Sequence, residues 1–112
     1  MNNDCIFCKI IAGDIPAEII TQNNDVIVIK DIAPKAPTHY LIIPKKHIKD
    51  IASLTADDDK IAASMVAMAQ HIAGDLNDGQ DFRLIMNNGK SVGQSVFHLH
   101  CHYLAGKKMT DL

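Results

Sequence analysis

Three histidines alternate with other residues near the end of the chain, in the run His98-Leu99-His100-Cys101-His102. Successive side chains of a β-strand point to opposite faces of its sheet, so a strand over residues 97–104 would carry all three imidazoles on one face, about 6.6 Å apart. A buried row of three titratable groups is costly without partners, so packing alone explains it poorly. The run therefore predicts a functional site. We expect Cys101, on the other face, to be a small buried side chain rather than a nucleophile.

Two kinds of chemistry fit such a row of imidazoles. Alternate histidines can chelate one metal ion and leave a coordination position open for an activated water molecule. Alternatively, one imidazole is a nucleophile, and its neighbours orient it and assist the leaving group. The loop before the predicted strand favours phosphoryl chemistry, because amide and hydroxyl side chains beside glycines suit the binding of a phosphate. The residues of this kind are Asn87, Asn88, Gly89, Gly93, Gln94 and Ser95.

A second motif, Cys5-Ile6-Phe7-Cys8, lies near the N-terminus. A thioredoxin-like redox function would place this motif in a βαβ unit, which the sequence does not predict. A structural zinc site needs four ligands, and histidines for the other two are offered by His47 and by the histidine run. We therefore expect structural zinc at this motif, and a pair of unliganded thiols is the alternative.

The elements around these motifs predict an α+β fold. Runs rich in β-branched and other apolar residues predict strands over 26–29, 39–43, 82–86 and 97–104, and residues 6–12 predict a short helix or turn. A long helix is expected to begin at Thr55, its N-cap, and to end at residues 77–79. Because the elements do not alternate as βαβ units, the sheet is expected to be mainly antiparallel. The apolar stripe of the helix comprises Ile61, Met65, Met68, Ile72 and Leu76.

Composition limits the classes of function. A chain of 112 residues fits one domain, residues 1–112, and a formal net charge of −2 disfavours nucleic acid or an anionic membrane as a partner. The chain has no apolar run of about 20 residues that would span a bilayer. Three cysteines cannot all pair, and no secretory signal is present, so we expect a cytoplasmic protein. The basic cluster that contains Lys107 and Lys108 is interpreted as solvated surface, and a funnel for phosphate groups is the alternative.

The histidine run, extended to Leu104, resembles the signature of the histidine triad (HIT) family. Five further stretches are similar to the nucleotide-binding, Hint-like branch of that family: residues 5–11, 31–34, 36–39, 43–47 and 93–96. These stretches occur in order and span nearly the whole chain. The resemblance implies a HIT-like α+β fold with a five-stranded, mainly antiparallel sheet, a long helix and a short N-terminal helix. It also implies a homodimer in which one sheet continues across two subunits.

The resemblance further implies an enzyme, a nucleotide-binding hydrolase. Such proteins cleave purine nucleoside phosphoramidates or related nucleotidyl compounds through a covalent nucleotidyl-histidine intermediate. Carried over residue by residue, His100 is the nucleophile, His102 contacts the phosphate and the leaving group, and His39 lines the same row. No metal is needed for the chemical step. The remaining implied nucleotide contacts are Ile6, Phe7, Asp31 and Ile32 around base and ribose, and Asn87, Gly93 and Ser95 near the phosphate. Ser95 is also implied as a catalytic residue, with His100, His102 and His39.

Zinc-bearing relatives match this chain at Cys5, Cys8, His47 and His98, which the resemblance therefore implies as the metal ligands. The chain also departs from the family pattern. Val92 replaces the first glycine of the usual Gly-Gly before Gln94, and the tryptophan-containing tail of some phosphoramidases is missing. The alternatives are a dinucleoside polyphosphate hydrolase, a nucleotidyl transferase, and a regulatory nucleotide-binding module without physiological turnover.

Overall fold

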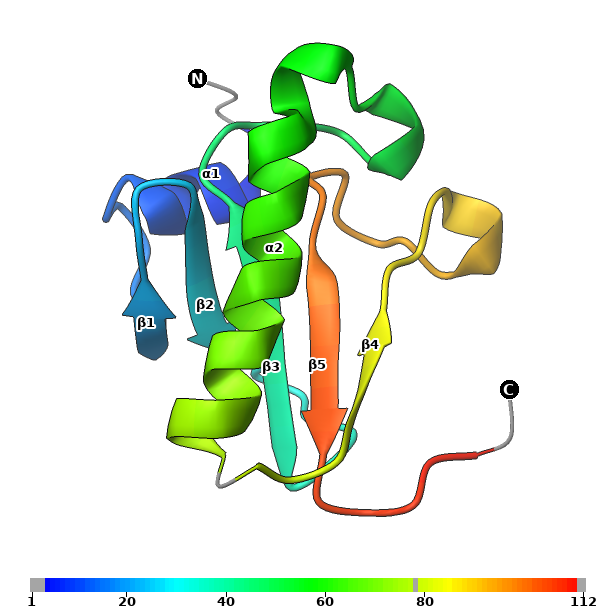
Figure 1. Cartoon of the computed structure of the whole chain (residues 1–112). Coiled ribbons are helices and arrows are strands. Elements are labelled where there is room, and N and C mark those ends of the chain that lie inside the picture. Colours follow the sequence, from blue (N-terminus) through cyan, green and yellow to red (C-terminus); the bar gives the residue numbers. More distant parts are fainter. Residues whose placement is uncertain (1–3, 78, 111–112) are drawn as a thin grey trace.

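The computed structural model describes residues 4–77 and 79–110. Five strands form one sheet in the order β1-β2-β3-β5-β4, and all neighbouring strands are antiparallel. The helix α2 crosses one face of this sheet, and the short helix α1 lies on the opposite face (Figure 1). The predicted α+β fold is therefore confirmed. The elements are α1 (Ile6–Ile11), β1 (Ile19–Gln22), β2 (Val26–Lys30), β3 (Thr38–Pro44), α2 (Asp59–His71), β4 (Phe82–Ile85) and β5 (Cys101–Ala105).

The long helix begins with a tight turn. Thr55 is the N-cap of a 3₁₀ turn, Ala56–Asp58, and its backbone N–H donates to the Asp58 carboxylate over 3.0 Å. Because this bond satisfies a free donor at the helix start, it supports the predicted beginning at Thr55. At the other end, α2 continues as a π-helical turn, Ile72–Leu76. The wider π turn shifts the helical register, and Leu76 is 43% exposed, so its predicted place on the buried stripe was wrong.

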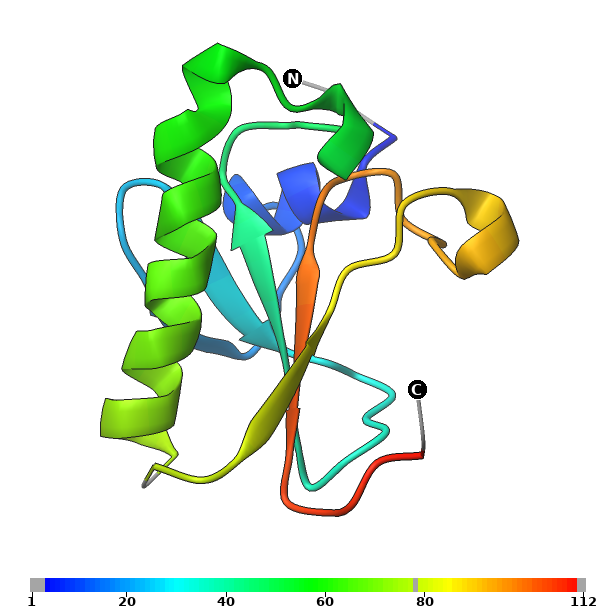
Figure 2. The same ribbon diagram turned by 45° about the vertical axis from the view of Figure 1, so that its right-hand side comes forward.

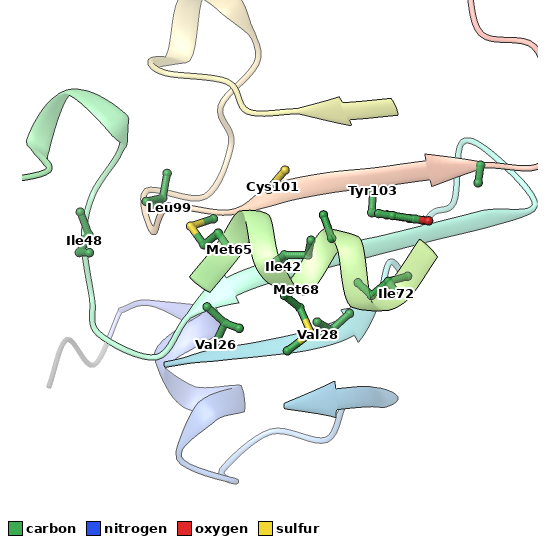
Figure 3. Packing of buried hydrophobic residues seen from close by; sticks show 12 residues of the cluster. Val26, Val28, Ile42, Ile48, Met65, Met68, Ile72, Leu99, Cys101 and Tyr103 are labelled. Carbon is green, nitrogen blue, oxygen red and sulfur yellow. The ribbon is translucent and has the colours of Figure 1, made fainter. Parts of the chain in front are cut away.

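The main core lies between α2 and the sheet, and Figure 3 shows its side chains in place. The methionines of the predicted stripe, Met65 and Met68, are buried there. A second, smaller cluster lies on the opposite face, where Phe7 and Cys8 of α1 pack against β2 and β3. The sheet residues of the main core are Val26, Val28, Ile42, Cys101, Tyr103 and Ala105; those of the second cluster are Ile27, Ile29, Leu41 and Ile43.

The histidine run departs from the predicted geometry. β5 begins at Cys101, so only His102 of the three histidines lies in a strand, and the prediction of one strand over 97–104 was wrong. Before β5, the Leu99 N–H donates to the Ile48 carbonyl over 2.6 Å, outside the sheet ladder. The alternation of sides nevertheless persists, because Leu99 and Cys101 pack into the core under α2.

One strand has no counterpart in the predicted runs. β1 is an edge strand of four residues that pairs with β2 through a bulge between Ile19 and Thr21. Figure 2 shows that the loop after β2 and the C-terminal segment leave the sheet at the same end. Within the described ranges, 4–77 and 79–110, no helix is long and apolar enough to cross a membrane.

Candidate active site

Strand register decides which side chains share the face opposite α2. Residues paired across antiparallel strands point to the same side of a sheet. His102 pairs with Leu41 on one side and with Ile85 on the other, and Leu104 likewise pairs with His39 and Arg83. β3, β5 and β4 therefore present His39, His102 and Arg83 on one face.

His100 lies just before β5, and one hydrogen bond fixes its tautomer. Its Nδ1 lies 2.8 Å from the carbonyl oxygen of His98, which can only accept, so Nδ1 carries the proton. In the neutral ring, Nε2 then keeps its lone pair. The Phe7 ring packs edge-on against the His100 imidazole, with 5.1 Å between ring centroids. His100 is thus held as an oriented imidazole with one nucleophilic nitrogen.

His39 and His102 form a hydrogen-bonded pair whose direction can be read from the backbone. The Lys35 N–H donates to His39 Nδ1 over 3.0 Å, so the proton of the neutral His39 ring is on Nε2. That nitrogen lies 2.9 Å from His102 Nδ1, which must accept. His102 therefore carries its proton on Nε2 and presents a donor, next to the nucleophile of His100.

Burial keeps this pair neutral. Together with the neighbouring His100 and His39, burial lowers the pKa of His102 to about 4, and Asp31 opposes the shift. Burial also lowers the pKa of His39, against the attraction of Asp31. The 3.3 Å contact between His39 Nε2 and the Asp31 carboxylate is therefore a contact to a neutral ring near pH 7, not an ion pair.

Acid should destabilise the fold through His102. Its pKa is about 6.5 when unfolded and about 4 in the native state. Between these values the unfolded chain binds more protons, so the free energy of unfolding should rise with pH from about 4 to 6.5 and be lost on acidification. Urea unfolding at several pH values should show a shallower rise for His102→Asn than for wild type. An unchanged slope in His102→Asn, with the exposed His71→Asn as control, would contradict this assignment.

A second cluster joins α1 to the histidine run. Its four ligand atoms, from Cys5, Cys8, His47 and His98, all lie within 4.8 Å of one another. His98 Nδ1 is 3.2 Å from Cys5 Sγ, 3.5 Å from Cys8 Sγ and 3.1 Å from His47 Nδ1. Ligands at zinc bond lengths of 2.0–2.3 Å in a tetrahedron lie about 3.3–3.8 Å apart, so the cluster has the size of a zinc site.

The surroundings of the cluster also suit a metal. His98 Nε2 donates to the Pro44 carbonyl over 2.7 Å, which leaves Nδ1 unprotonated and directed at the cluster. Burial lowers the pKa of His98, which favours the neutral ring that binds metals. Cys5 is the N-cap of α1, and its sulfur accepts the Cys8 N–H over 3.2 Å. The four residues therefore fit a structural zinc ion, and they supply no open position for chemistry.

Cys101 stands apart from this cluster. Its side chain is buried in the core under α2, and burial raises the pKa of its thiol to about 11. The thiol is therefore protonated near pH 7, as a poor nucleophile would be. The prediction of Cys101 as a small buried side chain is confirmed.

Gln94 organises the loop before the histidines. Its side chain is 3% exposed. Its Oε1 accepts the Gly89 N–H over 2.8 Å, and its Nε2 donates to the carbonyls of Lys49 and Val96 over 2.9 and 3.1 Å. Gln94 thus uses its amide to hold the loop, and the amide is not available to a phosphate. Val92, at the position of the usual glycine, points into solvent from a 3₁₀ turn.

Replacing Gln94 with alanine should therefore destabilise the protein. The change leaves one backbone N–H and two carbonyls without their partner. Each of these groups that does not bind water instead costs about 1–3 kcal/mol of stability. We expect the free energy of unfolding to fall by about 2–4 kcal/mol in urea titrations. Gln70→Ala, at an exposed position of α2, is the matched control. An equal, small effect of both changes would show that the Gln94 bonds do not hold the loop.

The predicted nucleotide contacts fall into two hollows. A cleft of about 560 Å³ brings together Asp31, His39, Asn87 and His102. Ile6 and Ser95 line a separate hollow of about 340 Å³ beside Cys5 and His47. Four other predicted contacts lie outside both linings. His100 lies just before β5 with Phe7 packed on its ring, Gly93 approaches the Asn87 side chain, and Ile32 is 99% exposed.

Comparison with known proteins decides the family. A family model described as scavenger mRNA decapping enzyme C-term binding matches residues 4–111. An uncharacterized HIT-like protein from Synechocystis is 43% identical over 107 residues, which cover 96% of this chain and 94% of that protein. The chain belongs to the HIT family. A solved structure described as a HIT family hydrolase from Clostridium thermocellum has 41% identity and a TM-score of 0.92, and the match covers 100% of this HIT chain and 98% of that chain.

A second solved structure bears on the metal. It is described as a Zn-bound histidine triad family protein from Mycobacterium smegmatis, with 34% identity and a TM-score of 0.81. The match covers 92% of this HIT chain and 75% of that chain.

Several groups that position the HIT histidines carried no sequence signal. The carbonyls of His98 and Pro44 and the N–H of Lys35 belong to the backbone, so residue type does not reveal them. Arg83 was also missed as a site residue, although it faces the cleft. The only indication of Arg83 is that it lies in the strand next to the histidine strand. Its side chain points to the same face of the sheet as His102.

Proposed function

We propose that this HIT protein is a cytoplasmic hydrolase of purine nucleoside phosphoramidates or related nucleotidyl compounds, acting through a covalent nucleotidyl–His100 intermediate. The observation that carries the proposal is the tautomer pattern of the histidines. His100 offers an unprotonated Nε2, while His102 offers an Nε2–H held in place by His39. One ring can attack while its neighbour donates a hydrogen bond to the departing atom.

In the first step, the lone pair of His100 Nε2 forms a bond to the α-phosphorus. The bond from phosphorus to the leaving nitrogen or oxygen breaks, and its electron pair goes to the departing atom, which leaves with a proton already carried by the substrate nitrogen or taken from solvent. The Nε2–H of the neutral His102 ring donates a hydrogen bond to that atom and stabilises the charge that develops on it. As His100 becomes positively charged, its Nδ1–H bond to the His98 carbonyl stabilises that charge. In the second step, water attacks phosphorus and loses its proton to solvent, and the electron pair of the phosphorus–nitrogen bond returns to His100 Nε2, which releases the ring.

Structural zinc at Cys5, Cys8, His47 and His98 is part of the proposal. The compact ligand set and the zinc-bound relative support it. Zinc would fasten α1 to the segment before His100, and through α1 it would hold Phe7 against the His100 ring. The ion supplies stability, whereas attack on phosphorus and the contact to the leaving group stay with the histidines.

We also propose a homodimer through β4, which is an edge strand of the sheet. Phe82, Leu84 and Met86 are each about two fifths exposed at this edge, and Val66 of α2 is 64% exposed nearby. An exposed apolar edge strand favours pairing with another strand. Sedimentation equilibrium should give twice the chain mass, and Leu84→Lys should shift the protein to a monomer. A monomeric wild-type protein at micromolar concentration would contradict the dimer.

Intact-protein mass spectrometry tests the covalent step. During incubation with an adenosine phosphoramidate, the wild type should gain the mass of one adenylyl group, transiently. His100→Ala should show no adduct, whereas His102→Ala should form or release it more slowly. His71→Ala, on the exposed surface of α2, is the control.

Two outcomes would contradict the proposal. An adduct that persists in His100→Ala would place the nucleophile elsewhere. Nucleotide binding without adduct or turnover in the wild type would favour a regulatory binding module.

A further inference from the structure

The cleft beside His102 has a strongly basic wall. Among the described residues that line it, Arg83, Lys107 and Lys108 carry positive charge on the side of β4 and the C-terminal segment. Asp31 is the one acidic residue among those lining residues, and it contacts His39. This concentration of positive charge contrasts with the formal net charge of −2 for the whole chain. Lys107 and Lys108 are exposed, as their interpretation as solvated surface expects, and they also line this cleft.

The C-terminal segment is fixed where it forms this wall. Gly106 has a φ of +99°, and an added Cβ would lie 2.8 Å from the Pro37 side chain. Both the backbone conformation and the close approach therefore require glycine at the turn that follows β5. Further along, Arg83 Nη1 donates to the Thr110 carbonyl over 2.9 Å. The segment is thus held at both ends beside the cleft.

The basic wall and the proposed nucleoside contacts lie on opposite sides of His102. Ile6 and Phe7 belong to α1, and Asp31 directly follows β2. Arg83 belongs to β4, beyond β5 in the strand order. A substrate with its nucleoside on the α1 and β2 side and its α-phosphorus at His100 would extend its leaving group across His102 toward Arg83.

We propose that Arg83, Lys107 and Lys108 form an anion subsite for the leaving group, so the substrates are nucleotidyl compounds that release a phosphate or oligophosphate. This inference rests on the proposed function. The bond between the α-phosphorus and the bridging oxygen breaks, and its electron pair goes to the leaving oxygen, where the three cations stabilise the developing charge. Lys35 is not included, because it lies in the loop between β2 and β3, on the nucleoside side of His102.

Phosphate binding can be measured without any turnover, because Arg83 is the only arginine of the chain. Its Nε–H signal in a nitrogen-15 NMR spectrum is therefore unambiguous. Titration of the zinc-loaded full chain with inorganic phosphate, at ionic strength matched with chloride, should move this signal. In Lys107→Ala/Lys108→Ala, the Kd for phosphate should rise about tenfold. Lys30→Ala/Lys60→Ala removes the same charge from exposed positions outside the cleft lining and should leave the Kd unchanged.

A kinetic comparison then connects the subsite to the reaction. The Lys107→Ala/Lys108→Ala protein should lose about tenfold of kcat/KM for diadenosine tetraphosphate, whose leaving group is ATP. It should keep the wild-type value for adenosine phosphoramidate, whose leaving group is ammonia.

The two assays separate failure of the subsite from failure of the proposed function. The subsite would be overturned by an Arg83 Nε–H signal that does not move when phosphate is added. It would also be overturned by the same Kd for phosphate in both double variants. Equal losses of kcat/KM for the two substrates would also overturn it. If neither substrate is turned over, the proposed function fails, and the phosphate titration still decides whether the anion subsite exists.

Discussion

The His100→Ala protein is expected to lose about 10⁴-fold of kcat/KM for an adenosine phosphoramidate. The loss is this large because removal of a nucleophile removes the covalent pathway, leaving only phosphate stabilisation and positioning. Binding of AMP should change by less than about threefold, a free-energy change below 1 kcal/mol. The expected nucleoside contacts, in α1 and after β2, do not include the His100 ring.

His102→Ala provides a graded comparison for this prediction. Loss of a hydrogen-bond donor to the developing charge typically lowers the rate about 10²–10³-fold, and the loss should grow as the leaving group becomes more basic. Steady-state kinetics on a series of leaving groups, with AMP affinity measured by calorimetry, checks both statements. His100→Ala activity within tenfold of the wild type would exclude His100 as the nucleophile.

Removal of zinc should have the largest effect on stability. An ion that binds only the folded chain stabilises it by about 2.7 kcal/mol when free zinc is 100 times the Kd. For a domain of this size, each kcal/mol corresponds to about 4–6 °C in melting temperature. Chelation, or Cys5→Ser, should therefore lower the melting temperature by about 10–15 °C.

Elemental analysis supplies the matched control for the zinc prediction. Cys5→Ser and His47→Asn should lose the bound zinc, whereas Cys101→Ala should retain it, because Cys101 lies in the core on the other face of the sheet. Cys101→Ala also loses core packing, so zinc content and not melting temperature is its readout. Wild-type protein that is purified without zinc and melts at the same temperature as Cys5→Ser would exclude a structural metal.

The sequence predicted the fold well where side-chain pattern alone decides it. β2 and β3 are β-branched runs buried in the sheet, and the capping residue Thr55 marked the start of the long helix. β1 was missed, because it is a short edge strand with mixed exposure and no alternation. The burial of Leu76 was predicted wrongly. The helix ends in a π turn, which changes the helical period, and residue types do not indicate such a turn.

The candidate site was predictable by residue type but not by geometry. Alternation correctly separated the histidines from Leu99 and Cys101, yet two of the three histidines precede the strand. The proton positions depend on backbone groups, such as the Lys35 N–H on His39, that only the folded chain reveals. Arg83 and the C-terminal lysines share a cleft because β4 and β5 are neighbours, although β4 precedes β5 in sequence by a long loop.

His98 takes part in both clusters through different atoms. Its imidazole belongs to the cysteine cluster, while its main-chain carbonyl accepts the Nδ1–H of His100. Substitution at position 98 removes a metal ligand but cannot remove a carbonyl, which every amino acid carries. A descendant of this protein could therefore lose its cysteines and the proposed metal and still keep His100 correctly protonated, provided another contact held the segment to Pro44. Metal dependence and catalysis are free to evolve separately at one residue.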